Sequence, residues 1–154
     1  MNEQKTKPEL YTHKSSTLPS FARALSHVTK PAVLITLGIG MYLHLTRLFI
    51  GTELLIKYIY TATLDAVFAI PMLLGVVSFL PAWKHIAFRN KFEKVIVILT
   101  GVYFLASVPL HIQTWYTQNT DYILAFPIWF SYLFLTYSSL LMIVWLRLRV
   151  GTGN

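Results

Sequence analysis

Four titratable side chains interrupt otherwise apolar stretches of the sequence: His44, Arg47, Asp65 and His111. His44 and Arg47 are three residues apart. Gly40 lies four residues before His44 and Gly51 four residues after Arg47, so one face of a helix would carry all four positions. Ionisable groups are rare within membrane-spanning segments and are functional candidates by default.

Two histidines from different helices can hold a haem. His44 and His111 would be the axial ligands of a b-type haem, and Arg47 would bind a propionate. His44, His111 and Asp65 would alternatively make a two-histidine-one-carboxylate metal site, and His44 or Asp65 could move a proton. No nucleophile motif, phosphate-binding loop or HExxH motif accompanies these residues. A protein that is not an enzyme is therefore favoured.

The same four residues are also compatible with roles that need no cofactor. Arg47 and Asp65 could form an interhelical ion pair, which would remove much of the free-energy penalty of burying either charge, with both histidines as neutral packing residues. Alternatively, the four groups line a polar pocket for a small ligand. Three residues of the following loop region are the candidate lid of that pocket: Trp115, Tyr116 and Asp121.

The composition indicates which elements must position these residues. Of 154 residues, 55% are hydrophobic and only 12% are charged, whereas a soluble domain has about 25% charged residues. This balance is typical of an integral membrane protein in contact with the lipid bilayer. The chain has no cysteine, which excludes disulfides, thiolate metal sites and cysteine nucleophiles.

Four apolar runs are long enough to cross a bilayer, which takes about 20 helical residues: 31–51, 58–81, 94–114 and 123–146. They show no strict alternation of apolar and polar residues, so helices are expected rather than a barrel. The predicted fold is an all-α, up-down bundle of four transmembrane helices. The first thirty residues lack the apolar core of a signal peptide, so the first run is expected to remain as a span.

The basic residues predict how the bundle is oriented. Eleven of the thirteen Lys and Arg lie in the N-terminal tail, the middle loop or the C-terminus. By the positive-inside rule both termini are cytoplasmic, in a bacterial inner membrane by expectation, although a mitochondrial inner membrane would give the same pattern. The net charge of +7 is thus explained without nucleic acid. In this orientation His44 and Asp65 both lie about 10 Å below the outer interface.

Outside the spans, the sequence divides into short segments. Residues 1–16 and 150–154 are expected to be flexible, and the four-helix domain covers 31–149. Residues 17–30 carry apolar residues at helical spacing and predict an amphipathic helix on the inner membrane surface, or else an ordered lead-in to the first span.

The functional prediction follows from size and from the polar cluster. We expect a small non-enzymatic membrane protein, which is either an accessory or assembly subunit of a larger membrane complex with membrane protein partners, or a binder of a small ligand in the outer-leaflet pocket. The alternative is an electron-transfer protein with one haem b held by His44 and His111.

Overall fold

The computed structural model describes residues 20–150. Its helices are α1 (Ser20–Ile50), α2 (Thr52–Tyr58), α3 (Ala62–Trp83), α4 (Lys91–Thr117), α5 (Tyr122–Ala125) and α6 (Trp129–Arg147), and one short antiparallel pair joins β1 (Ile86–Ala87) to β2 (Arg149–Val150). Four helices are long and apolar enough to cross a membrane: α3, α4, α6 and the Ala24–Ile50 part of α1. The prediction of an all-α, four-span membrane bundle is confirmed.

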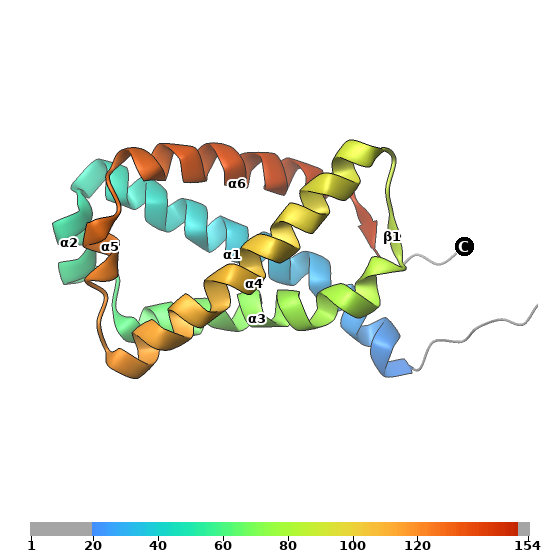
Figure 1. Ribbon diagram of the computed structural model, residues 1–154, viewed down its shortest axis with the longest axis horizontal. Coiled ribbons are helices and arrows are strands. Elements are labelled where there is room, and N and C mark those ends of the chain that lie inside the picture. The colour runs from blue at the N-terminus through green and yellow to red at the C-terminus, as the bar shows by residue number, and fades with distance from the viewer. Residues whose placement is uncertain (1–19, 151–154) are drawn as a thin grey trace, which may run out of the picture.

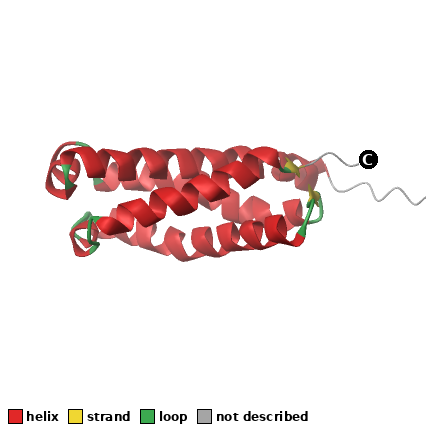
Figure 2. Ribbon diagram, turned by 90° about the horizontal axis from the view of Figure 1, so that it is seen from above, coloured by secondary structure: helices red, strands yellow, loops and turns green. Residues whose placement is uncertain are grey.

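The four long helices form a closed ring of neighbours (Figures 1 and 2). Helix α1 packs along both α3 and α6, and α4 packs along α3, so α1 and α4 occupy diagonal corners. The contact between α4 and α6 is the smallest of the four. Figure 1 shows the reason: α4 crosses the bundle obliquely and moves away from α6 as it approaches α5.

The tightly packed part of the bundle lies where α4 and α6 are close. Trp145 of α6 is fully buried, and its Nε1 donates a hydrogen bond to Thr100 Oγ1 of α4 at 3.0 Å. Gly75 lets α3 approach α4, because a Cβ at that position would lie 2.9 Å from Phe104 Cε2. An indole and a phenyl ring thus fill the interior with few gaps, as close-packed cores require.

The first helix differs from the expectation of a separate surface helix over 17–30. Helix α1 runs without a break from Ser20 through Pro31 to Ile50. Thr29 Oγ1 donates to the carbonyl of Ser78, and Lys30 Nζ donates to the carbonyls of Leu146 and Leu148. Because these bonds attach the lead-in to α3 and to the end of α6, it continues the span. Residues 1–19 and 151–154, which include most of the segments expected to be flexible, lie outside the described residues.

The fourth predicted span, 123–146, is also divided. Pro127 cannot donate a backbone hydrogen bond and disfavours helical geometry in the residue before it. Phe126 is accordingly extended, with φ −84° and ψ 122°. Helix α5 therefore ends at Ala125, and the spanning helix α6 begins at Trp129.

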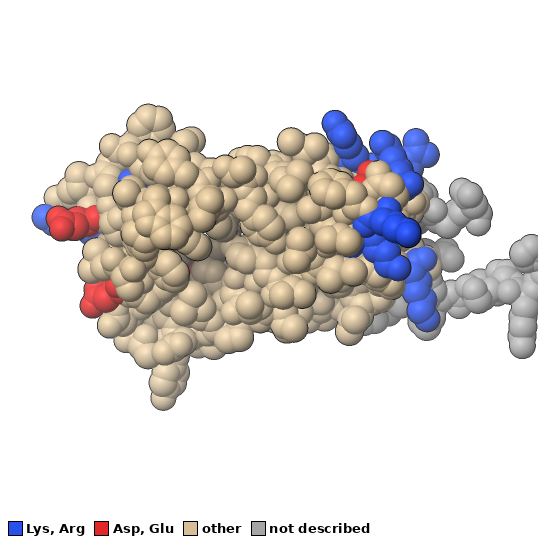
Figure 3. All heavy atoms as spheres, turned by 45° about the horizontal axis from the view of Figure 1, so that its top comes forward, with Lys and Arg blue, Asp and Glu red and all other residues tan. Residues whose placement is uncertain are grey.

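Basic side chains gather at one end of the molecule (Figure 3), which we call the basic end. It comprises the β1–β2 pair and the adjoining helix ends, with Lys30, Lys84, Arg89, Lys91, Lys94, Arg147 and Arg149. The opposite end carries α2 and α5, and we call it the α5 end. The described chain begins and ends at the basic end (Figure 1).

Candidate functional site

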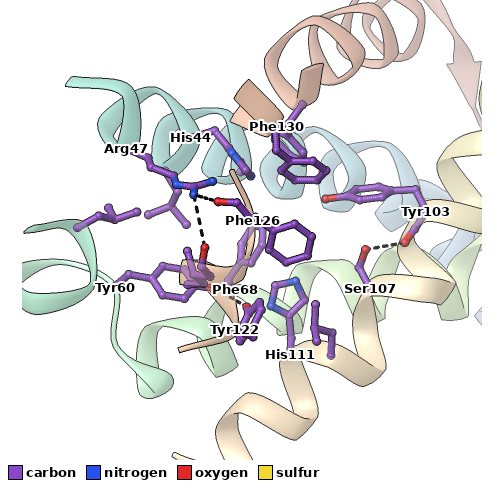
Figure 4. A pocket seen from close by; sticks show the side chains of 16 residues that line it. His44, Arg47, Tyr60, Phe68, Tyr103, Ser107, His111, Tyr122, Phe126 and Phe130 are labelled. Atoms are coloured by element: carbon purple, nitrogen blue, oxygen red, sulfur yellow. Dashed lines mark hydrogen bonds between the residues drawn. The ribbon is translucent and has the colours of Figure 1, made fainter. Parts of the chain in front are cut away.

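A cavity of about 170 Å³ lies toward the α5 end, within the ring of four long helices. Its polar lining comes from α1, α4 and the segments around α2 and α5: His44, Arg47, Tyr60, Ser107, His111 and Tyr122. Aromatic residues make up much of the remaining wall: Phe68, Tyr103, Phe126, Phe130 and Phe134. Figure 4 shows His44 and His111 projecting toward this space from opposite walls. On the outer surface, Figure 3 shows a hollow in the side that displays α4 and α6.

The structure brings together three of the residues singled out in the sequence. His44, Arg47 and His111 line the cavity, and Asp65 lies behind His111, fully buried. The expected lid residues lie elsewhere: Trp115 and Tyr116 are exposed near the end of α4, and Asp121 is exposed in the loop. Trp115 and Tyr116 lie more than one turn beyond His111, past the end of the cavity. The cover consists instead of Tyr122, Ile123 and Phe126.

Asp65 joins three elements through one oxygen atom. Its Oδ1 lies 2.5 Å from His111 Nδ1 and also accepts a hydrogen bond from the Tyr60 hydroxyl. The Tyr60 and Tyr122 hydroxyls are 3.3 Å apart. These two tyrosines lie outside the four spans, and burial raises the pKa of each, so both remain neutral at physiological pH. The second carboxylate oxygen, Oδ2, is buried without a hydrogen-bond partner among the described residues.

Arg47 does not pair with Asp65, so the expected ion pair is wrong. Within residues 20–150 the one basic side chain within ion-pair distance of an acidic one is His111, beside Asp65, and the contact is an ion pair only when the imidazole is protonated. The buried Arg47 guanidinium instead donates to four neutral oxygens: Thr52 Oγ1 at 2.8 Å, Ser131 Oγ at 3.4 Å, and the carbonyls of Ile123 and Phe126. The end of helix α5 before Pro127 provides the two carbonyl acceptors, of which that of Ile123 also accepts from Phe126 N at 3.3 Å. Arg47 thereby attaches the α5 segment to α1.

His44 is held on one side by a hydrogen bond and on its face by a phenyl ring. Its Nδ1 lies 3.0 Å from Ser131 Oγ, and its ring stacks on Phe134 with centroids 3.9 Å apart and an interplanar angle of 20°. Ser131 Oγ accepts from Arg47, and in its bond with His44 Nδ1 either atom is the donor, depending on the histidine tautomer.

Each histidine keeps one nitrogen for the cavity. Neither His44 Nε2 nor His111 Nε2 has a hydrogen-bond partner in the described part of the chain. Among the described residues, three side-chain polar atoms are fully buried and have no hydrogen-bond partner: Asp65 Oδ2, His85 Nε2 and Ser138 Oγ. The Nε2 atoms of His44 and His111 are not among them, so neither nitrogen is fully buried.

The expected metal set does not assemble. No group of three His, Cys, Asp or Glu side chains that could hold a metal ion occurs among residues 20–150. His111 and Asp65 are in contact, whereas His44 comes from the diagonal helix and points to Ser131 and Phe134. The structure therefore gives no support to a centre of His44, His111 and Asp65.

Ser131 and Tyr60 are among the site residues that were not recognised from the sequence. Ser131 bonds to both His44 and Arg47, and Tyr60 bonds to Asp65. Ser131 and Ser138 are seven residues apart and both fully buried. Small polar residues at this spacing are typical of a helix–helix contact face, which is the signal that could have identified Ser131. No local signal in the sequence distinguishes Tyr60 from the nearby Tyr58.

Comparison with protein-family models, with curated proteins and with solved structures finds no match to this chain. The class that the fold and the cavity define is a multi-pass integral membrane protein, a four-span bundle with an aromatic and histidine-lined cavity toward one end.

Proposed function

We propose that this protein is a non-enzymatic membrane protein that binds a small lipid-soluble ligand in the cavity. The observation that carries the proposal is the pair of imidazole Nε2 atoms, from His44 and His111, that face one cavity without a protein partner. A polar group inside an apolar bundle costs free energy unless it has a hydrogen-bond partner. A ligand with matching polar atoms would satisfy both.

The bilayer is the natural source of such a ligand. The hollow lies on the side where α4 and α6 diverge (Figure 3), and apolar side chains at that end of these two helices are exposed, among them Ile112 and Leu133. In a membrane, lipid covers these side chains. A hydrophobic molecule could therefore reach the cavity sideways. Exposed apolar side chains would suit lipid and a partner subunit equally, so an accessory role in a larger complex gains no separate support.

We infer that the basic end faces the cytoplasm and that the cavity lies in the outer half of a bacterial inner membrane. The segregation of basic residues supports this orientation. The cysteine-free chain allows a direct test with single cysteines at two exposed positions, Lys84→Cys and Asn119→Cys. A membrane-impermeant maleimide added to intact cells should label only Asn119→Cys. Labelling of Lys84→Cys alone would reverse the orientation.

Haem b is the second candidate, since His44 and His111 approach one cavity from diagonal helices and each ring has Nδ1 engaged and Nε2 unpartnered. Two features oppose it. The cavity volume of about 170 Å³ is below the range of about 300–1,000 Å³ typical of drug-sized ligands, and Phe68 and Phe134 pack against the histidines. A visible spectrum of the protein expressed with ample haem decides: a Soret band, with α and β bands after dithionite reduction, would establish haem.

Ligand binding is tested by thermal unfolding with an organic extract of the host membrane. A ligand that binds only the folded state raises the midpoint temperature. Ser107→Leu should abolish the increase, because Ser107 lines the cavity and the larger side chain would occupy it. Ala106→Leu, at an exposed position on the same helix, is the matched control and should behave like the wild type. The proposal is overturned if the extract raises the midpoint temperature of the wild type, Ser107→Leu and Ala106→Leu equally, or if it raises none of them.

A further inference from the structure

We propose that the ligand is a lipid-soluble quinol, an aromatic ring with two hydroxyl groups on opposite edges and an apolar tail. This inference rests on the proposed function and identifies the chemical class that the cavity would bind. It follows from which atoms at the cavity donate and which accept hydrogen bonds, and from the shape and chemistry of the wall between them.

The His111 side of the cavity presents a hydrogen-bond acceptor. Asp65 Oδ1 is 2.5 Å from His111 Nδ1, and a carboxylate accepts, so the Nδ1 proton points to Asp65. In the neutral ring Nε2 then carries a lone pair toward the cavity. Tyr60 donates to the same Asp65 oxygen and so favours a carboxylate that accepts from Nδ1, and we take His111 as the neutral ring. The ligand atom near His111 should therefore be a donor, such as a hydroxyl.

The His44 side presents a hydrogen-bond donor. We assign the Ser131 proton to the bond with His44 Nδ1, because Ser131 Oγ already accepts from Arg47, and this assignment leaves the ring proton on Nε2. The ligand atom near His44 should therefore be an acceptor. A hydroxyl is both donor and acceptor, so a ring with two hydroxyls can serve both histidines. A quinone has two carbonyl acceptors and cannot donate to His111.

The wall between the two histidines suits a flat ring. His44 stacks on Phe134, and His111 meets Phe68 edge to face with centroids 5.1 Å apart. Gly40 brings these phenyl rings together, since a Cβ at that position would lie 2.9 Å from Phe134 Cζ and 3.6 Å from Phe68 Cζ. Aromatic rings favour offset and edge-to-face contacts of this kind. An aromatic headgroup is therefore favoured over a branched aliphatic one.

Charge argues against an anionic headgroup. Arg47 is the one cationic Lys or Arg side chain on the cavity wall, and four neutral oxygens already use most of its N–H groups. The neutral groups that can meet a ligand are the two imidazole Nε2 atoms and the hydroxyls on the cavity wall, among them those of Ser107 and Tyr122. The cavity volume of about 170 Å³ suits a headgroup alone, so an apolar tail would leave through the hollow between α4 and α6.

The test compares ligands that differ only in their hydroxyls. The probes are decyl-substituted 1,4-benzoquinol and 1,4-naphthoquinol kept reduced, their quinones, and their dimethyl ethers, titrated into purified full-length protein in zwitterionic nanodiscs. At least one quinol should bind about tenfold more tightly than its own dimethyl ether and its quinone, which is the factor expected for one hydrogen bond. The quinol that binds more tightly shows whether the natural ligand has a benzene or a naphthalene ring.

Variants locate the effect. His111→Phe should remove the preference of the quinol over its ether, whereas Ala106→Leu should keep it. If His111→Phe does not fold, the ligand comparison on the wild type still decides. Equal affinity of quinol and ether would overturn the inference. If no ring binds while the membrane extract still raises the midpoint temperature of the wild type but not of Ser107→Leu, the quinol inference fails and the proposed function stands. If neither the rings nor the extract binds, both fail.

Discussion

Asp65 of α3 contacts His111 of the adjacent helix α4, with Oδ1 2.5 Å from Nδ1, and Arg47 bonds neutral oxygens instead. The carboxylate therefore orients an imidazole at the cavity wall instead of neutralising the guanidinium. A buried acid, two histidines and an arginine thus each have polar partners in an apolar bundle: Asp65 contacts His111, Ser131 contacts His44, and Arg47 bonds the α5 segment.

Asp65→Ala should destabilise the bundle. The substitution leaves the His111 Nδ1–H and the Tyr60 hydroxyl without their acceptor, and each unsatisfied buried donor costs about 1–3 kcal/mol. Thermal unfolding in detergent measures the change. Asp121→Ala, which removes an exposed acid from the loop, is the control and should leave the midpoint unchanged. Equal midpoints for the two variants would show that the Asp65 contacts carry no net stability.

Arg47→Lys should release the cover of the cavity while the helices remain folded. A lysine ammonium cannot reproduce the planar set of donors that bonds Thr52, Ser131 and the carbonyls of the α5 segment. Amide hydrogen exchange over residues 122–128 should become faster, with little change in α3. Lys57→Arg, at an exposed position on α2, is the matched charge-conserving control. Unchanged exchange at 122–128 in Arg47→Lys would contradict the assigned role.

Two glycines of α1 should respond in opposite ways to alanine. A Cβ at Gly40 would lie 2.9 Å from Phe134 Cζ and displace that ring, at a cost of about 1–3 kcal/mol for overpacking. A Cβ at Gly38 would meet Met142 Cε at 3.9 Å, an ordinary contact, so the better helix propensity of alanine should stabilise by up to about 1 kcal/mol. Denaturant or thermal unfolding of both variants checks this. The account fails if Gly40→Ala is as stable as Gly38→Ala.

Stability should fall at high pH through Tyr60 and Tyr122. Burial raises the pKa of both hydroxyls, so the folded protein keeps protons that the unfolded chain loses above about pH 10. The stabilisation is complete below that pH and decreases as the pH rises beyond it. Unfolding midpoints between pH 8 and 11 should therefore decline less steeply in Tyr60→Phe than in the wild type. Tyr116→Phe, at an exposed position, should follow the wild type.

The sequence was sufficient to predict the four spans, because uncharged runs of about 20 residues have few alternatives to a membrane helix. It also grouped His44, Arg47 and His111 as candidate pocket residues, and all three line one cavity. The partner of Asp65 could not be derived in this way. Helical periodicity gives the face of α3 on which Asp65 lies, but α3 packs against both α1 and α4, and only the packing decides which helix the carboxylate reaches.

The cover of the cavity was missed for a different reason. Trp115 and Tyr116 were expected there as loop residues, but α4 continues to Thr117 and carries both past the cavity. The break at Pro127 then turns Phe126 inward, and this turn depends on a carbonyl bond from Arg47, 79 residues away in the chain. Long-range bonds of this kind leave no local pattern in a sequence.

The most direct test of the account is native mass spectrometry of the protein released from lipid nanodiscs. The wild type and Ala106→Leu should carry a bound small molecule of one defined mass, and Ser107→Leu should be free of it. An adduct retained by Ser107→Leu would place the ligand outside the cavity. A wild-type protein with no such adduct would contradict the claim that the cavity is a binding site.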